Sequence, residues 1–159
     1  MMETDYFQHP RRFPKNAPGP FYTIGRQSPR DDSPNSPLVW RGECLWCGAP
    51  EAEAPTLFAP FDDTYTDTYF VRQPENDDEL EAAISSTAVC CVSAVRYGGR
   101  DRAIIERLNN DPDVCDYIVG DDGQLLLTVG DNGDLLPFAE RIADKLRKAA
   151  ARKWWQFWR

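Results

Sequence analysis

The sequence has one histidine, two methionines and no apolar run that approaches the ~20 residues a membrane-spanning helix needs. It also lacks an excess of positive charge, since 26 acidic residues oppose 18 basic ones and the net charge is −8. This balance argues against a nucleic-acid binder, because phosphate contacts need a clustered Lys/Arg surface. The first five residues include two acids and begin no apolar leader, so export is not expected.

Cysteine is present five times, at positions 44, 47, 90, 91 and 115. An odd number of unevenly spaced cysteines without a secretory leader fits a disulfide framework poorly. It favours reduced thiols or a metal site, and the expected location is therefore cytoplasmic.

Proline is concentrated in the first 60 residues, which hold ten of the thirteen. Residues 1–37 are predicted to be an extended, poorly ordered segment, with 28–37 as its most linker-like part. The single histidine, His9, lies in this segment and is predicted to be solvated.

Residues 38–116 are predicted to form an α+β core. Residues 66–71 and 92–97 have the β-branched and aromatic content of strands. A helix is predicted within 73–84, because acids occupy its first turn and Leu80, Ala83 and Ile84 share one face. A second helix is predicted over 101–108, and a short one over 51–58, interrupted by Pro55.

Residues 117–159 are predicted to form a hairpin over 117–129 followed by an amphipathic helix from about 135 to 158. From 141 to the end the helix carries seven basic residues against one acid. Its last turns hold the residues Lys153, Trp154, Trp155, Phe157 and Trp158. This composition is typical of a segment that settles on a membrane surface or docks into a partner, although packing on the protein's own core is the alternative.

Cys44 and Cys47 form a C-x2-C pair with a glycine directly behind, which suits a turn that aims two sulfurs at one ion or cluster. Zinc is disfavoured, because the second pair, Cys90 and Cys91, is adjacent and histidine is nearly absent. A redox dithiol is disfavoured because Pro50 and Pro55 interrupt the helix that should follow.

The segment 44–58 reads C-x2-C-G-x-P-E-x2-A-P-x-L-F and resembles the first half of a bacterial single-cluster ferredoxin. The segment 87–95, T-A-V-C-C-V-S-A-V, resembles the second half, which supplies the last ligand. The resemblance implies a ferredoxin-like core within 38–116 that carries a 4Fe-4S or 3Fe-4S cluster and exchanges electrons with a redox partner protein.

The chain departs from that family at two positions. The third motif cysteine is replaced by Pro50, and the proline expected after the last cysteine is Cys91. By resemblance, the ligands that carry over are Cys44, Cys47 and Cys90. Cys91 or Cys115 would complete the set, unless one iron stays open or the cluster has been lost. Burial as small apolar side chains is the other interpretation of these thiols.

No catalytic constellation is recognised in the sequence, so the chain is not expected to be an enzyme. The leading prediction is a small electron-transfer protein. The alternative is a cluster-free, ferredoxin-like interaction module that presents its basic, Trp-rich helix to a partner protein or a membrane. The acids at 75, 77, 78, 79 and 81 would suit docking on a basic partner, or they serve the helix dipole alone.

Overall fold

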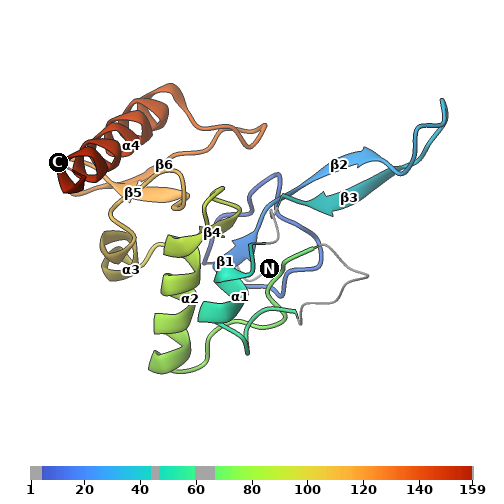
Figure 1. The fold of residues 1–159 in the computed structure, drawn as a ribbon, viewed down its shortest axis with the longest axis horizontal. Coiled ribbons are helices and arrows are strands. Elements are labelled where there is room, and N and C mark those ends of the chain that lie inside the picture. The colour runs from blue at the N-terminus through green and yellow to red at the C-terminus, as the bar shows by residue number, and fades with distance from the viewer. Residues whose placement is uncertain (1–4, 44–46, 60–66, 159) are drawn as a thin grey trace.

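The computed structural model describes residues 5–43, 47–59 and 67–158, and within these ranges the chain is a mixed α+β protein (Figure 1). Four helices accompany six short strands, which pair two by two into three separate antiparallel sheets. The predicted α+β class is therefore confirmed. The finer expectation, a ferredoxin-like core, stays a prediction.

The three sheets join different parts of the chain. Strand β1 (Phe21–Thr23) pairs with β4 (Val95–Tyr97) in the body of the protein. Strand β2 (Gly25–Pro29) pairs with β3 (Leu38–Gly42), and the two form a ribbon that projects from the body (Figure 1). Strands β5 (Tyr117–Val119) and β6 (Leu125–Leu127) confirm the predicted C-terminal hairpin.

Helix α2 (Asp77–Val89) confirms the helix predicted within 73–84 and extends it by more than a turn. Asn76 caps it, because its side-chain oxygen accepts the backbone N–H of Glu79 at 2.9 Å. Three acids in the first turn face the positive end of the helix dipole. Ala83 and Ile84 are buried on the inner face, and Cys90 follows the last turn.

Helix α1 (Ala49–Glu53) packs against α2 (Figure 1). It is shorter than the helical segment predicted over 51–58, because the chain leaves the helix at Ala54, directly before Pro55. The strand predicted over 66–71 is reduced to a single bridge between Phe58 and Phe70, and residue 66 lies outside the described residues.

The two remaining helices agree with the sequence pattern. Helix α3 (Arg102–Arg107) begins at Asp101, whose carboxylate accepts the backbone N–H of Ala103 at 2.9 Å. The chain turns away from the helix just after its C-cap, Leu108, at Asn109 and Asn110, which both adopt positive φ. Helix α4 (Pro137–Phe157) confirms the long C-terminal helix and lies beside the β5–β6 hairpin (Figure 1).

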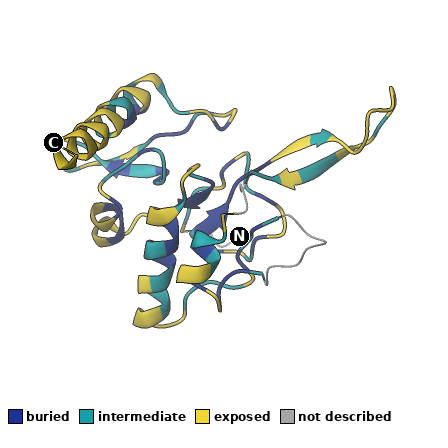
Figure 2. Cartoon of the chain, in the orientation of Figure 1, coloured by how far each residue is buried: buried dark blue, intermediate teal, exposed yellow. Residues whose placement is uncertain are grey.

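The core gathers between β1, β4, α2 and α3, where Figure 2 shows most of the buried residues. Aromatic rings form its centre: Phe58 lies 4.3 Å from Phe70 between ring centroids, and Phe21 lies 4.9 Å from Tyr97. Contact between such large side chains accounts for much of the burial that stabilises a small domain.

The N-terminal segment differs from the prediction of disorder over residues 1–37. Phe13 is buried, its backbone N–H donates to the carbonyl of Thr23, and Phe7 donates to Gly98. Residues 28–37, predicted to be a linker, form the end of β2 and the turn into β3. The prolines exclude long regular strands here, but aromatic side chains still fasten the segment to the body.

The prediction that His9 is solvated is also wrong, because its side chain is buried and the residue is 4% exposed. Its Nδ1 accepts the backbone N–H of Arg11 at 3.0 Å. Burial first, and then the positive charges of Arg96 and Arg11, lower the pKa of His9 from 6.5 to about 3. His9 is therefore neutral in the native protein at neutral pH.

A buried ion pair joins β4 to the segment that leads into β5. The Arg96 side chain is 7% exposed and the Asp116 side chain 0%. Arg96 donates from Nε at 3.0 Å and from Nη2 at 2.8 Å to one oxygen of Asp116, and Tyr22 donates its hydroxyl to the other at 2.5 Å. Burial alone would lower the pKa of Arg96, but Asp116 and Tyr22 raise it above the ordinary value.

Candidate metal centre

The thiols of Cys47, Cys90 and Cys91 come together where α1 and α2 meet. Cys47 is exposed and directly precedes Gly48, whose φ of 72° turns the chain into α1. Cys90 and Cys91 follow the last turn of α2. Because α1 packs against α2, two segments more than forty residues apart in sequence bring their cysteines to one place.

The electrostatics of Cys91 indicate that two other thiols lie near it. Desolvation first, and then the neighbouring thiol of Cys47, raise the pKa of Cys91. Cys90 acts on the same pKa through its charge. We call these three neighbouring residues the thiol cluster (Cys47, Cys90 and Cys91).

Cys90 is half-buried, whereas Cys47 and Cys91 are exposed, and it packs against both parts of the apolar core. The backbone N–H of Ala94 donates to its Sγ at 3.3 Å. Ser93, at φ 53°, turns the chain so that this amide returns to the sulfur. An N–H donor of this kind stabilises negative charge on a thiolate.

The other two cysteines are placed differently. Cys44 lies outside the described residues. Cys115 is fully buried in the main core, where desolvation raises its pKa to about 12. The charged groups that act on Cys115 are Arg96, Asp116 and Asp111, and no other thiol of the described residues is among them. Cys115 thus behaves as a small core side chain.

A ready-made site for a single ion is not found among residues 5–43, 47–59 and 67–158, where no three His, Cys, Asp or Glu side chains are arranged to hold a metal. The thiol cluster is thus a gathering of donors rather than a closed tetrahedral site. Cys44, three residues before Cys47 in the sequence, lies outside these ranges.

The surface around the thiol cluster is partly apolar. Val89 and Val92, which flank the Cys90–Cys91 pair, are both exposed. The exposure of these valines was not predicted from the sequence, although their place on either side of the Cys90–Cys91 pair was visible in it.

The acids suggested as a docking surface lie at the opposite end of α2 from the thiol cluster, ~20 Å away at 1.5 Å per residue. Two of them are paired within the protein: Glu79 accepts from Arg72, and Glu81 from Arg107. The Arg72 guanidinium, followed by the backbone N–H of Glu75, lowers the pKa of Glu79 to about 2. These pairs and the helix cap favour the structural interpretation of the acids.

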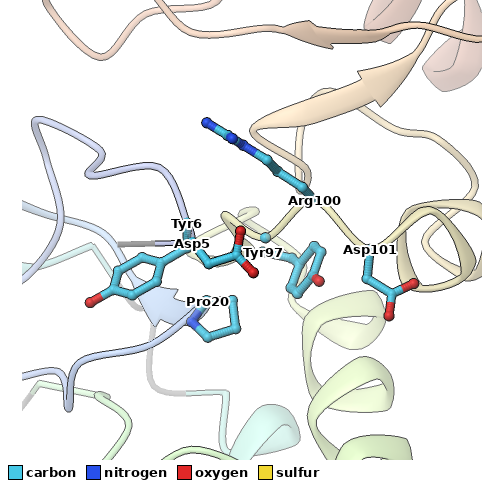
Figure 3. Close-up of a pocket in the computed structure, with 7 residues that line it drawn as sticks. Asp5, Tyr6, Pro20, Tyr97, Arg100 and Asp101 are labelled. Carbon is cyan, nitrogen blue, oxygen red and sulfur yellow. The ribbon is translucent and has the colours of Figure 1, made fainter. Parts of the chain in front are cut away.

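A separate pocket of about 350 Å³ lies beside Tyr97, with Asp5, Tyr6 and Pro20 on one side and Asp101 on the other (Figure 3). Its polar side chains already have structural partners. Asp101 caps α3, and Arg100 stacks over the ring of Tyr117 at 5.0 Å. The pocket therefore adds no chemistry to the thiol cluster.

The aromatic end of α4 is bare. Trp154, Trp155, Phe157 and Trp158 are 69%, 75%, 88% and 76% exposed, and Lys153 is exposed beside them. Trp154 and Trp158 stack with ring centroids 6.3 Å apart. In the part of the chain that the structure describes, these side chains do not cap the core, which was the alternative that the sequence left open.

Comparison with known proteins gives no relative: no family model, no curated protein and no solved structure matches this chain. Among the described residues, no helix has both the length and the apolar character needed to cross a bilayer.

Proposed function

We propose that the chain is a small electron-transfer protein that holds one iron–sulfur cluster on thiolates of the thiol cluster, with Cys44 as a further ligand. The observation that supports this most is the packing of α1 against α2, which brings Cys47 near Cys90 and Cys91 although the sequence keeps the two segments far apart. Cysteines gather in this way either to bind a metal centre or to form a disulfide, and the predicted reduced compartment favours the first.

The donor set fits an iron–sulfur cluster better than a single ion. Iron–sulfur clusters are held almost entirely by cysteine thiolates, and the donors that this site offers are cysteine thiols. A 4Fe-4S or 3Fe-4S cluster also spreads its ligands further apart than one zinc ion does. Adjacent cysteines such as Cys90 and Cys91 are more easily accommodated by such a spread than by one tetrahedral ion.

A bound cluster would supply one-electron oxidation and reduction, and the chain's own residues would control its surroundings. The Ala94 N–H would donate to the Cys90 sulfur, which favours the reduced, more negative state. The exposure of Cys47 and Cys91 would keep the site close to the surface, and Val89 and Val92 would meet the partner. No acid, base or nucleophile is required of the protein in this role.

The test is anaerobic purification of the full chain, followed by reconstitution with iron and sulfide. The expected result is a brown protein with broad visible absorption and matching iron and sulfide contents. Cys47→Ser and Cys91→Ser should each lose most of the iron and the colour. Cys115→Ser is the matched control and should keep both, because Cys115 lies in the core away from the thiol cluster.

Two results would overturn the proposal. A colourless, folded protein with five titratable thiols would favour the cluster-free interaction module. A protein that binds one zinc ion and no sulfide would show that the same cysteines form a structural site instead.

A further inference from the structure

Residues 147–158, which are the last eleven residues of α4 and its C-cap Trp158, are all exposed, whereas the first half of the helix is packed against the body (Figure 2). Ala139 and Ala143 are buried, and Phe138 and Ile142 join the main core. At 1.5 Å per residue, the bare portion is ~18 Å long. We call this portion the tail helix (residues 147–158).

The aromatic side chains of the tail helix gather on one side, and two of its four basic residues, Lys148 and Arg152, lie on the other. Lys153 borders the aromatic side, and Arg147 lies in line with that side about two turns earlier, where it pairs with Asp113 of the body. With 3.6 residues per turn, Trp154, Phe157 and Trp158 fall within an arc of ~100°, and Trp155 lies ~60° beyond it. Arg152 lies on the opposite side, in line with Arg141, Lys145 and Lys148 further up α4. A helix with one aromatic face and one basic face is typical of segments that lie in a membrane interface.

Four of the six basic side chains of α4 have no ion-pair partner among the described residues. Arg147 pairs with Asp113 and Glu140, and Lys148 pairs with Asp144. The cations left over are Arg141, Lys145, Arg152 and Lys153. Unpaired positive charge beside exposed aromatic rings is complementary to a bilayer surface, where anionic headgroups lie above apolar acyl chains.

From these observations we infer that the tail helix anchors the protein on an anionic lipid surface. The rings of Trp154, Phe157 and Trp158 would enter the boundary between headgroups and acyl chains, and the cations would meet lipid phosphates and carboxylates. An apolar hollow of about 410 Å³ between Trp154, Trp155 and Trp158 offers room for lipid atoms. The acidic remainder of the chain would be repelled by the same surface, which leaves the tail helix as the point of attachment.

This inference is independent of the iron–sulfur proposal, because the tail helix belongs to a different element from the thiol cluster. The test is co-sedimentation of the full chain with vesicles of phosphatidylcholine alone and of phosphatidylcholine with 30% phosphatidylserine. Binding to the anionic vesicles should be at least ~10-fold tighter and should weaken strongly between 0.05 and 0.5 M salt.

Variants assign the binding to the two faces. Trp154→Ala/Phe157→Ala/Trp158→Ala should abolish sedimentation, and Arg152→Gln/Lys153→Gln should weaken it by about 10-fold. The matched control is Arg26→Gln/Arg30→Gln, which removes two cations from the projecting ribbon and should leave binding unchanged. Circular dichroism would verify that each variant folds; full folding is expected, since every changed side chain is exposed.

Three outcomes would overturn the inference. The first is equal binding to neutral and anionic vesicles. The second is binding that the aromatic variant retains. The third is a chain that does not bind vesicles but forms a dimer that dissociates in the aromatic variant. In that case the aromatic face would be covered by a second copy of the chain.

Discussion

Asp116→Asn should be among the most destabilising conservative changes in the chain. The substitution keeps the shape of the side chain and removes its negative charge. Arg96 would then be a buried guanidinium without a counter-ion, and it cannot lose its proton. Its acceptors would all be neutral: the amide oxygen of the new side chain and the carbonyl oxygens of Pro112, at 3.1 Å, and Asp113.

The magnitude follows from the burial of both partners. Breaking a buried ion pair by removing one charge costs about 3–5 kcal/mol. For a chain of this size, each 1 kcal/mol lowers the melting temperature by about 2–4 °C, so the variant should melt about 6–20 °C below the wild type. The lower end applies if water reaches the Arg96 side chain once the carboxylate is gone.

The assay is thermal and urea unfolding followed by circular dichroism at neutral pH. Asp131→Asn, an exposed carboxylate in a turn, is the matched control and should change stability by less than about 0.5 kcal/mol. In Arg96→Met/Asp116→Asn, much of the loss should be recovered, because no uncompensated charge remains. A loss below about 1 kcal/mol for Asp116→Asn alone would refute the reasoning.

Three further predictions concern single side chains. Because the pKa of His9 falls from 6.5 to about 3 on folding, only the unfolded chain takes up this proton between those values, so stability is complete above pH 6.5 and declines as the pH falls toward 3. Between pH 7.5 and 5 the wild type should lose about 2 kcal/mol more than His9→Asn in urea titrations, and parallel losses would contradict this. In the cluster-free native chain, iodoacetamide should modify Cys115 at least ~100-fold more slowly than Cys47, and peptide mapping that finds equal rates would disprove its burial. Asn76→Ala should cost α2 about 1 kcal/mol in thermal unfolding through loss of its cap, and an unchanged melting temperature would show that the cap is dispensable.

The elements that the sequence predicted well are those with strong local signals. The acids before Leu80, the glycine between β5 and β6, and the apolar spacing along α4 each act within a few residues, so the pattern alone is sufficient. Helix α4 begins within two residues of the predicted start, and its last assigned residue is one residue short of the predicted end.

The N-terminal segment could not be predicted because its order comes from distant partners. Composition takes no account of contacts with the rest of the protein, and by composition alone the seven prolines of residues 1–37 favour disorder. The hydrogen bond from Gly98 to Pro20 and the burial of Phe13 exist only after folding. The same limit applied to His9, whose burial depends on Tyr22 and Arg96.

The sequence predicted which cysteines belong to the candidate site better than it predicted where they lie in the fold. The resemblance identified Cys47 and Cys90 as ligands by their spacing. Cys91 replaces the proline that the family has at this position, so the resemblance did not indicate where its side chain lies. The structure places Cys91 near Cys47 and Cys115 in the core. Neither placement follows from spacing, because the first depends on how α1 packs against α2 and the second on how the segment after α3 pairs with β4 at Tyr97.

The pairing of β1 with β4 has a consequence for how the protein is made. Tyr22 and Asp116, which meet in the buried ion-pair network, are 94 positions apart in the chain. During synthesis the N-terminal aromatic residues therefore leave the ribosome long before their partners exist, and the core cannot close until β4 and the segment after α3 have followed. Closing so large a loop late slows folding, and it leaves Phe13, Phe21 and Tyr22 accessible to chaperones while the rest of the chain is being added.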